Sequence, residues 1–381
     1  MVDGHSLPAL AGYRIGITAD RRRDEQARLF EHHGATVLHG PTIECRPRTD
    51  FASLSHATER IIAERVGTVV LTTGHGTRAW LSWAESHGLL AGLFPVLRHA
   101  RIIARGPKAA GAAVAAGLGV AWTPPNGTLA EVVEHLIELR DDRPSTVAVQ
   151  VDGADRQPGV EALEAAGIST IPISVYEWVA PTDPNPALRL IDAVAERTVD
   201  AVTFTSAPAV AGFFALADDA GLRPRLLDSF NRRGVTAICV GSVCRTRAEA
   251  EGVREVIMPK RPRLGAMVHA YVAHQAQQRR AFRIGGVEAV IQGRLVLFRN
   301  ADATTAVNLS ERERGVLEAL VRRPGAVVSK RSLLREVWGA TESDEHLAEV
   351  TVARLRQRLG PFGSSIETVV RRGYRIGVEL R

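Results

Sequence analysis

The residues best suited to chemistry lie near the C-terminus, in the stretch "ARLRQRLGPFGSSIETVVRRGYRIG" over 353–377. A helix is predicted over about 344–359, because apolar residues recur there at helical spacing. These inward-facing residues are Ala348, Val352, Leu355 and Leu359. The opposite face then presents Thr351, Arg354 and Arg358, with Arg356 beside them. Guanidinium and hydroxyl groups bind phosphates and base edges, so this face is a candidate nucleic-acid contact.

A second group of candidate residues lies in turns of the first 275 residues, where a short β-branched run leads into a helical segment. Backbone N–H groups at the start of a helix bind anions, and small or hydroxyl residues leave them accessible. The candidates are Arg21, Arg22, Gly74, His75, Arg105, Lys108, Thr205, Ser206, Lys260 and Arg261. Turn geometry alone explains each small residue, but the whole set favours a polycarboxylate or phosphate ligand over a neutral one.

These turns recur because the first 275 residues contain an internal repeat. "VLTTG" matches "VTFTS" at an offset of 132, Gly34 and Gly167 end helical segments 133 apart, and Gly106 and Gly241 are 135 apart. Each unit reads as strand, turn and helix, which predicts two similar α/β lobes with parallel sheets covered on both faces. Strands are expected at 14–18, 68–72, 146–151, 201–205 and 237–240. The binding turns would lie at the carboxyl ends of these strands.

The last hundred residues differ from the rest in charge. From position 281 onward the chain has 17 Lys and Arg against 12 Asp and Glu, so this part carries +5 of the formal net charge of +6. That asymmetry predicts a polyanion-binding module on a nearly neutral body. Ser310 and Glu313 form the capping-box pattern of a first helix, and Ser329 caps a second. With the helix at 344–359 and two β runs around a basic turn, this is the layout of a winged helix–turn–helix.

Composition and missing motifs exclude several other classes of protein. Of the 381 residues, 45% are hydrophobic and 24% are charged, as in an ordinary folded protein. No apolar run reaches about 18 residues and the first ten residues are too short and polar for a signal peptide, so a cytoplasmic protein with no membrane partner is expected. The three cysteines lack metal-site spacing, and no P-loop, G-x-G-x-x-G or nucleophile elbow occurs. Neither a metal nor a cofactor is therefore expected.

The order of motifs over roughly residues 10–275 resembles uroporphyrinogen-III synthase. The resemblance rests on "YRIGITADRRRDEQARLFEHHGATVLHGPTIE", "VVLTTGHGTRAW", "PISVYEW", "AVTFTSAPAVAGF" and "ICVGSVCRTRAEAEGV". It implies two lobes joined by a pair of β connections, with lobe one at about 12–42 plus 175–275 and lobe two at about 43–174. It also implies cyclisation of hydroxymethylbilane, a linear tetrapyrrole polycarboxylate held largely by backbone amides in the cleft.

The sequence departs from this family at two turns. The family often has G-x-x-T-A there, with a threonine hydroxyl in the cleft, whereas Ala109 and Cys244 stand at the threonine positions here. Tyr176 matches the family's cleft tyrosine, and Gly241 with Ser242 begins the second of the two turns. These three residues join the candidate ligand-binding set, and no catalytic residue is assigned. The missing hydroxyls favour ligand binding over synthase activity.

The segment over about 285–378 resembles the OmpR-type output domains of response regulators. "LSERERGVLEAL", "PGAVVSKRSLLREVWG", "VTVARLRQRLG" and "IETVVRRGYRIG" match the motifs of that family in order. The resemblance implies that Thr351 and Arg354 face base edges, and that Arg356, Arg358 and Thr368 hold phosphates. The family's wing pattern T-V-R-G-x-G-Y is shifted by one place here, which leaves Arg371 and Arg372 as the wing candidates.

The sequence thus predicts a synthase-like α/β domain over 1–275, a linker over 276–284 and a winged-helix domain over 285–381. The leading hypothesis is a transcriptional regulator that binds double-stranded DNA as a homodimer and senses a tetrapyrrole or other polyanion. Ligand-driven closure of the two lobes would alter how the DNA-binding domains are presented. The alternative is an active uroporphyrinogen-III synthase with an added DNA-binding module, and a third hypothesis is a scaffold whose cleft is empty.

Overall fold

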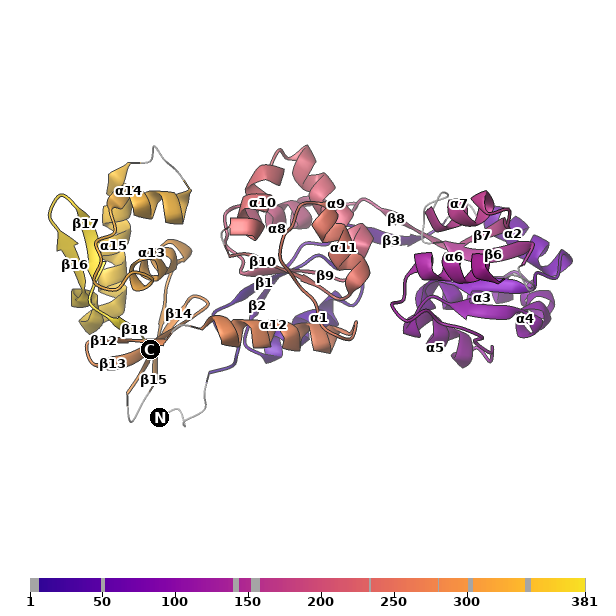
Figure 1. The fold of residues 1–381 in the computed structure, drawn as a ribbon, viewed down its shortest axis with the longest axis horizontal. Coiled ribbons are helices and arrows are strands. Elements are labelled where there is room, and N and C mark those ends of the chain that lie inside the picture. The colour runs from indigo at the N-terminus through magenta and orange to yellow at the C-terminus, as the bar shows by residue number, and fades with distance from the viewer. Residues whose placement is uncertain are drawn as a thin grey trace. The chain divides into compact units, whose positions relative to one another are not determined.

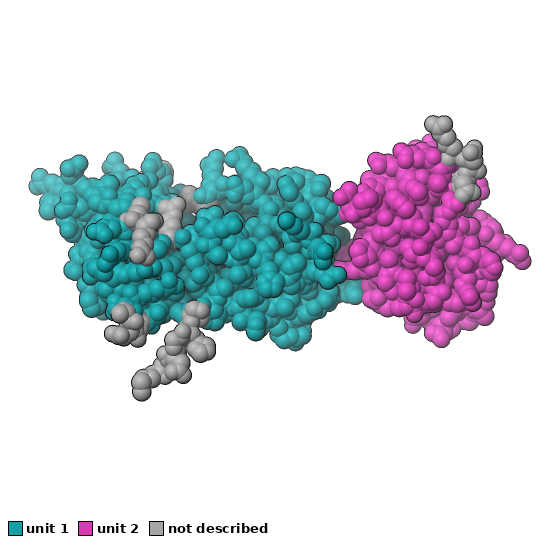
Figure 2. Space-filling model, turned by 60° about the horizontal axis from the view of Figure 1, so that its bottom comes forward, with its two compact units in different colours: residues 1–42, 183–381 teal, residues 43–182 magenta. Residues whose placement is uncertain are grey.

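The computed structural model describes residues 7–48, 52–139, 144–151, 158–232, 234–279, 281–300, 304–339 and 344–380. The chain forms two compact units, which Figure 2 shows in different colours. One unit is discontinuous and contains residues 1–42 and 183–381, whereas the other is continuous over residues 43–182. The discontinuous unit itself holds an α/β body and a C-terminal winged-helix domain (Figure 1).

The continuous unit is built around a four-stranded parallel sheet in the order β5-β4-β6-β7. Its strands are β4 (Thr68–Leu71), β5 (Arg101–Ala104), β6 (Thr146–Val151) and β7 (Ser169–Ser174). Its helices are α2 (Ala52–Ala63), α3 (Gly74–Ser86), α4 (Leu90–His99), α5 (Pro107–Ala115), α6 (Leu129–Glu138) and α7 (Pro158–Ala165). Every residue of β4 is buried, as expected for a parallel strand covered on both faces. An antiparallel pair, β3 (Glu44–Pro47) and β8 (Tyr176–Val179), forms the two ends of this segment.

The body of the discontinuous unit contains a five-stranded parallel sheet in the order β11-β10-β9-β1-β2. The strands are β1 (Arg14–Ile17), β2 (Thr36–His39), β9 (Ala201–Phe204), β10 (Thr236–Cys239) and β11 (Val256–Ile257). The helices are α1 (Arg23–His32), α8 (Asn185–Ala195), α9 (Ala207–Asp219), α10 (Arg223–Arg232), α11 (Ser242–Ala250) and α12 (Leu264–Gln278). Strands β1 and β9 pair with Ile15 opposite Ala201, so segments from both ends of the insertion share the middle of the sheet.

The internal repeat is confirmed by matching helix starts. Thr73 and Ser206 both have extended backbone before α3 and α9, and each hydroxyl accepts a hydrogen bond from a backbone N–H of the first turn. Gly106 and Gly241 share a φ of −170°, with ψ of 177° and 178°, before α5 and α11. The five predicted strands are also confirmed, because both bounds of each lie at or next to the observed ones. The β-branched runs therefore located strands in both parallel sheets, although β2, β5, β7 and β11 were not among the predicted strands.

The winged-helix domain begins with an antiparallel sheet in the order β15-β14-β13-β12-β18. Its strands are β12 (Ala281–Ile284), β13 (Val287–Gln292), β14 (Leu295–Arg299), β15 (Thr304–Asn308) and β18 (Glu379–Leu380). The helices are α13 (Glu311–Val321), α14 (Lys330–Leu333) with its π-helical continuation η1 (Leu334–Trp338), and α15 (Glu345–Leu359). The 3-10 helix η2 (Gly360–Ser365) leads to the hairpin of β16 (Ile366–Val369) and β17 (Gly373–Ile376). The first two helices are capped by Ser310 and Ser329, as predicted.

None of the helices that the structure describes combines the length and the apolar character needed to cross a bilayer.

The capping box at the start of α13 gives a stability prediction. The Glu313 N–H donates to the Ser310 hydroxyl at 3.3 Å, and the Ser310 N–H donates to the Glu313 carboxylate at 2.7 Å. Ser310→Ala removes the first bond and should lower the free energy of unfolding of this domain by about 1 kcal/mol. Hydrogen exchange of the α13 amides across a denaturant titration measures the loss. Gln357→Ala on the exposed face of α15 is the control, and an equal loss in both variants would contradict the prediction.

Candidate functional site

The outer face of α15 carries the candidate base-contacting residues. Its inner face is buried through Ala348, Val352, Leu355 and Leu359, as the helical spacing predicted. Arg354 and Arg358 are exposed on the outer side, and Thr351 is half-buried with its hydroxyl donating to the Leu347 carbonyl at 2.8 Å. The Leu347 side chain is 46% exposed one turn earlier. The helix thus presents cationic, hydroxyl and apolar groups together, which are the groups that base edges and thymine methyls contact.

Arg356 joins α15 to the wing. Its guanidinium donates to the Ile366 carbonyl from Nε at 2.9 Å and from Nη2 at 2.6 Å, and to the Thr368 hydroxyl at 2.9 Å. The guanidinium also lies 5.8 Å from the centre of the Tyr374 ring, within the range of a cation–π contact. Arg356 and Thr368, two of the predicted phosphate contacts, are therefore bonded to each other and fix β16 to α15. Their role toward phosphate stays a prediction.

The wing is the hairpin of β16 and β17, which a basic turn closes. Val328 and Tyr374 exchange backbone hydrogen bonds of 2.7 and 3.0 Å, which hold β17 against the segment before α14. Gly373, at a φ of 133°, approaches this segment so closely that a Cβ would lie 2.1 Å from the Val328 carbonyl oxygen. The exposed residues of the turn are Val370, Arg371 and Arg372. The hairpin thus presents two arginines from an anchored base.

Carboxylates compensate one of the candidate DNA contacts and leave others uncompensated. The Nε of Arg358 is 3.8 Å from the carboxylate of Glu313. Within the part of the chain that the structure describes, no carboxylate lies at ion-pair distance from Arg354, Arg371 or Arg372. Exposed guanidinium groups without a counter-charge favour a partner that brings phosphates.

In the continuous unit, three candidate ligand-binding residues lie around the N-terminus of α3. The hydroxyls of Tyr176 and Thr73 are 3.1 Å apart, and the rings of Tyr176 and His75 have centres 5.4 Å apart. A Cβ on Gly74 would lie 2.2 Å from the Lys108 carbonyl oxygen, so α3 and α5 begin side by side. The structure therefore brings Gly74, His75, Tyr176 and the start of α5 to one edge of the sheet.

Gln150 supports this turn, and the sequence analysis did not select it. It lies on β6 and its side chain is 1% exposed. The side-chain Oε1 of Gln150 accepts hydrogen bonds from the N–H groups of Thr72 and Thr73 at 3.0 and 3.1 Å. Its side-chain Nε2 donates to the Thr73 hydroxyl at 3.2 Å. A Cβ on Gly76 would lie 1.6 Å from the Gln150 amide nitrogen, which explains the second glycine of the turn. A glutamine within a β-branched strand was the available signal, because buried amides need hydrogen-bond partners.

The body of the discontinuous unit holds a corresponding set at the carboxyl ends of its own strands. The candidates are Arg21 and Arg22 after β1, Thr205 and Ser206 after β9, and Gly241 and Ser242 after β10. These strands are neighbours in the parallel sheet, so the three turns share one edge. The Ser206 hydroxyl accepts from the Ala209 N–H at 3.3 Å. Arg22 donates to Glu25 at 2.5 and 2.6 Å, and this hydrogen bond raises the pKa of the guanidinium.

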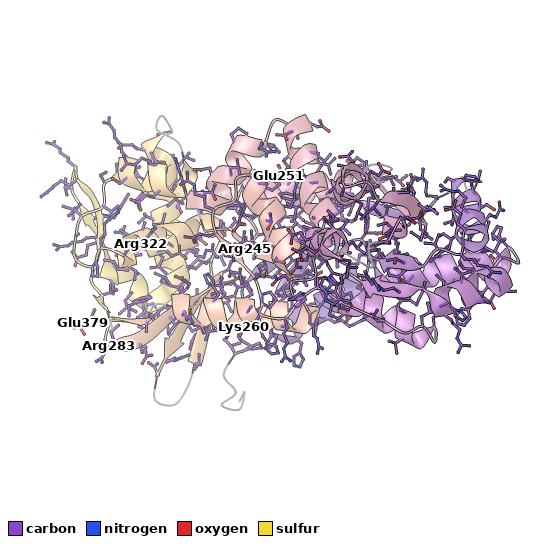
Figure 3. The ribbon with its side chains drawn as sticks, turned by 45° about the vertical axis from the view of Figure 1, so that its right-hand side comes forward. Arg245, Glu251, Lys260, Arg283, Arg322 and Glu379 are labelled. Atoms are coloured by element: carbon purple, nitrogen blue, oxygen red, sulfur yellow. The ribbon has the colours of Figure 1, made fainter. Side chains whose placement is uncertain are left out.

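The remaining basic candidates lie at or near the surface. Lys108 is exposed on the first turn of α5, and Arg105 is half-buried just before that helix. Lys260 and Arg261 are exposed in the segment that precedes α12, where Figure 3 labels Lys260. In each unit taken by itself, cationic side chains thus accompany helix N-termini at strand ends. This combination suits an anionic ligand.

The two positions where the resembled family has threonine carry no hydroxyl and are buried. Ala109 and Cys244 are 1% and 4% exposed, and each packs into the hydrophobic core of its own unit. Burial, with a smaller effect of Cys244, raises the pKa of the neighbouring Cys239 thiol. The Cys239 thiol therefore stays protonated and is a poor nucleophile. Among the described residues, no group of three or more His, Cys, Asp or Glu side chains is arranged to hold a metal ion.

Comparison with known proteins identifies the family of the α/β part. Residues 24–269 match the family model described as "Uroporphyrinogen-III synthase HemD". A crystal structure of a mutant uroporphyrinogen III synthase from the extremely thermophilic bacterium Thermus thermophilus is 28% identical with a TM-score of 0.57, covering 70% of this chain and 99% of that one. "Uncharacterized protein YjjA" of Bacillus subtilis (strain 168) is 28% identical over 263 residues, which is 68% of this chain and 94% of the relative.

A second match concerns the C-terminal part. Residues 304–376 match the family model "Transcriptional regulatory protein, C terminal". "Transcriptional regulatory protein TcrA" of Mycobacterium tuberculosis (strain H37Rv) is 40% identical over 77 residues, which is 19% of this chain and 30% of the relative. The likeness to TcrA is thus confined to this one domain. The winged-helix domain is a DNA-binding domain of the transcriptional-regulator type, which confirms the prediction from the sequence.

The bonding of Arg356 predicts how a conservative substitution will behave. Arg356→Lys keeps the positive charge but loses the two-atom contact with the Ile366 carbonyl, so the wing should loosen. Hydrogen exchange of the β16 amides should accelerate, and DNA affinity should fall by about 10- to 150-fold, because hydrogen bonds to charged groups contribute about 1.5–3 kcal/mol. Arg358→Lys, two residues along the same helix, is the matched control. If Arg356→Lys changes neither quantity, Arg356 acts only as a point charge toward phosphate.

Proposed function

The chain belongs to the uroporphyrinogen-III synthase family, and from this premise we propose that it is a DNA-binding transcriptional regulator in which the synthase-like part senses a polyanion. The observation that carries the proposal is the exposed basic face of α15 beside a basic wing, on a chain whose remaining residues form a synthase-like α/β fold. Proteins that bind sequence-specifically on DNA need both phosphate contacts and base contacts. Arg354 and Thr351 supply the base contacts, whereas Arg358, Arg371 and Arg372 supply phosphate contacts.

The ligand we propose is a tetrapyrrole polycarboxylate or a related polyanion. Support comes from the turns at strand carboxyl ends, where helix N-termini lie beside Arg21, Lys108 and Lys260. Backbone amides and cations bind carboxylates without requiring a particular side-chain acid or base. Two copies of the chain binding neighbouring half-sites on DNA complete the proposal, since a dimer doubles the contacts of a single recognition helix.

Sensing is favoured over catalysis by the two buried positions Ala109 and Cys244. Neither offers a hydroxyl, and both side chains pack into the core of their own unit. An active synthase with an added DNA-binding module remains the second candidate function. Incubation with hydroxymethylbilane separates the two functions, because conversion to uroporphyrinogen III at enzyme-like turnover supports the synthase and contradicts a role in sensing alone.

The DNA-binding proposal predicts different effects for two arginines of α15. On a sequence selected by the protein from a random pool, Arg354→Ala should cost about 1–3 kcal/mol of discrimination against other sequences. Arg358→Ala should weaken specific and random DNA alike, and lower the slope of log K against log salt by about 0.9. Arg28→Ala, an exposed arginine of α1, is the control. Equal losses of Arg354→Ala on specific and random DNA would refute its role in base recognition.

The sensing proposal predicts that uroporphyrinogen III binds the folded chain. At a concentration about 100 times its Kd, it should raise the free energy of unfolding by about 2.7 kcal/mol. The double variant Arg21→Ala with Lys260→Ala should weaken this binding, whereas the charge-matched double variant Arg28→Ala with Arg98→Ala should not. Calorimetric titration under anaerobic conditions measures the binding of uroporphyrinogen III to both double variants, and denaturant unfolding with and without the ligand measures the change in stability. Absence of binding to the unsubstituted chain, with DNA binding intact, would contradict the sensing role and leave the regulator role standing.

A further inference from the structure

The winged-helix domain is bonded to the α/β body within the discontinuous unit. The turn between β13 and β14 meets the segment that enters β1. The Arg294 N–H donates to the Gly12 carbonyl at 2.9 Å, and the Gln292 amide donates to the Pro8 carbonyl at 3.0 Å. A Cβ on Gly293 would lie 2.5 Å from the Gly12 carbonyl oxygen, so the two backbones touch there. A contact this close requires glycine in both segments.

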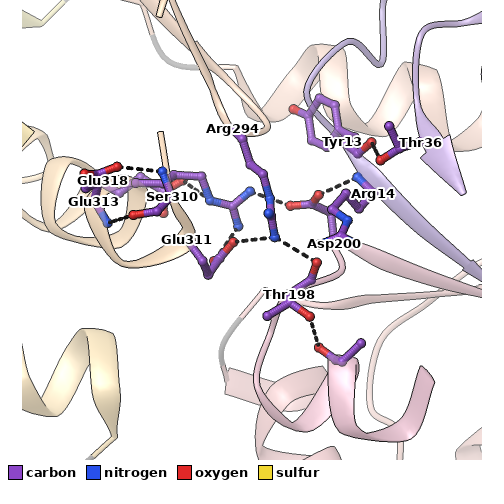
Figure 4. A network of polar contacts seen from close by, with 12 residues as sticks. Tyr13, Arg14, Thr36, Thr198, Asp200, Arg294, Ser310, Glu311, Glu313 and Glu318 are labelled. Carbon is purple, nitrogen blue, oxygen red and sulfur yellow. Dashed lines mark hydrogen bonds and ion pairs between the residues drawn. The ribbon is translucent and has the colours of Figure 1, made fainter. Parts of the chain in front are cut away.

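Beside this contact lies a cluster of charged side chains, Asp200, Arg294, Glu311 and Arg314, which we call the docking cluster. Asp200 is buried and the other three are half-buried. Arg314 of α13 forms an ion pair with Asp200 of the body, and their side chains are 15% and 7% exposed. Arg314 also pairs with Glu311 at 3.1 Å. Arg294 donates to the Thr198 carbonyl at 2.8 Å and lies 3.4 Å from Glu311 (Figure 4). Charges from two domains are thus buried against one another.

The ionisation of the docking cluster reflects this burial. Burial raises the pKa of the Glu311 carboxyl and lowers the pKa of the Arg294 guanidinium. Burial also tends to lower the pKa of the Arg314 guanidinium. The carboxylates of Asp200 and Glu311 outweigh this effect, so the pKa of Arg314 is raised. Arg314 therefore stays charged, and its charge needs Asp200 for compensation. Removing one member of a buried pair leaves the other without compensation.

A second contact reinforces the docking. The Val337 carbonyl, in the last turn of η1, accepts from Arg197 of the body and from Arg312 of α13 at 2.6 Å. Arg312 also lies 5.6 Å from the ring centre of Trp338 and 3.6 Å from Glu196. Contacts with the body thus come from the β13–β14 turn, α13 and η1. The outer face of α15 and the wing keep their exposed side chains.

The docking cluster lies at the amino ends of β1 and β9, whereas the candidate ligand-binding turns follow the carboxyl ends of the same two strands. Asp200 immediately precedes β9, and its second carboxylate oxygen accepts from the N–H of Arg14, the first residue of β1 (Figure 4). Both strands end at the turns that hold Arg22 and Ser206. Each strand has four residues and spans about 13 Å at about 3.3 Å per residue, and its hydrogen bonds make it stiff along its length. A displacement at one end therefore reaches the other.

We propose that this docking surface, with the Asp200–Arg314 pair at its centre, couples ligand binding in the body to the position of the DNA-binding domain. This inference rests on the proposed sensing function for its input. Ligand bound at the turns after β1 and β9 shifts these strands, and a shift at Asp200 weakens or strengthens its pairing with Arg314. Because buried ion pairs tolerate little misalignment, a small shift selects between a docked and a released domain.

Full-length Arg314→Met tests the docking directly. The variant leaves the carboxylate of Asp200 without its guanidinium partner, so the domain should undock. Hydrogen exchange at the Arg294 amide, whose N–H donates to the Gly12 carbonyl, should then accelerate relative to the unsubstituted chain. Arg322→Met is the matched control, because Arg322 is the C-cap residue of the same helix and pairs within the domain, with Glu336 at 3.7 Å. Arg294→Gln is a second variant that perturbs the surface without leaving Asp200 unpaired, in case Arg314→Met folds poorly. Unchanged exchange at the Arg294 amide in both surface variants would overturn the proposal.

The coupling itself is measured as DNA affinity with and without uroporphyrinogen III. A coupling of the usual size changes the Kd for DNA by about 5- to 150-fold in the unsubstituted chain. Both surface variants should lose most of this change while still binding uroporphyrinogen III, and Arg322→Met should keep it. Retention of the full change in an undocked variant would overturn the proposal.

One result separates this inference from the function on which it rests. If uroporphyrinogen III neither binds nor changes the DNA affinity of the unsubstituted chain, the sensing function fails. Docking is then judged by the ligand-free proteins alone. A change of DNA affinity in Arg314→Met and Arg294→Gln but not in Arg322→Met supports a docking surface that sets DNA binding, and equal affinities in all four proteins overturn it.

Discussion

The parallel pairing of β1 with β9 is the constraint on which the discontinuous unit depends. These strands come from either side of a continuous unit that contains residues 43–182, and without their pairing the five-stranded sheet has no centre. The same pairing aligns two turns at one edge of the sheet. It also places Asp200 and the N–H of Arg14 together at the other edge, where Arg314 is bound. The register of β1 against β9 thus determines both the candidate ligand-binding edge of the sheet and the place where the DNA-binding domain docks.

Much of the fold was predictable from local sequence. Runs such as "TVVL" and "AVTF" are apolar throughout or nearly so, and only a strand buried on both faces requires that pattern over so few residues. Ser310 with Glu313 predicted a helix start because a capping box satisfies backbone groups that nothing else nearby can satisfy. The inward and outward faces of α15 followed from helical spacing alone, because a helix presents residues three and four apart on one side.

The tertiary roles of polar residues were not predictable in the same way. Gln150 stands in an otherwise apolar strand, and its partners at Thr72 and Thr73 follow another strand, so spacing gives no indication of them. Arg356 reads as one more arginine on an exposed helix, yet its bonds to Ile366 make it part of the wing. Asp200 and Arg314 belong to different domains, and neither has a neighbouring motif that marks it as one half of a buried pair. Such pairings depend on the assembled fold.

The attachment of the wing to α15 through Arg356 has a consequence for the operators that this protein can use. Because Arg356 bonds the hairpin to the helix, the distance between the proposed groove contact of the helix and the proposed contact of the wing tip is fixed. An operator with one base pair inserted between these two contacts cannot be matched by a change in the protein. The duplex must then bend or twist to restore the match, so local DNA stiffness contributes to operator choice at positions that no side chain touches.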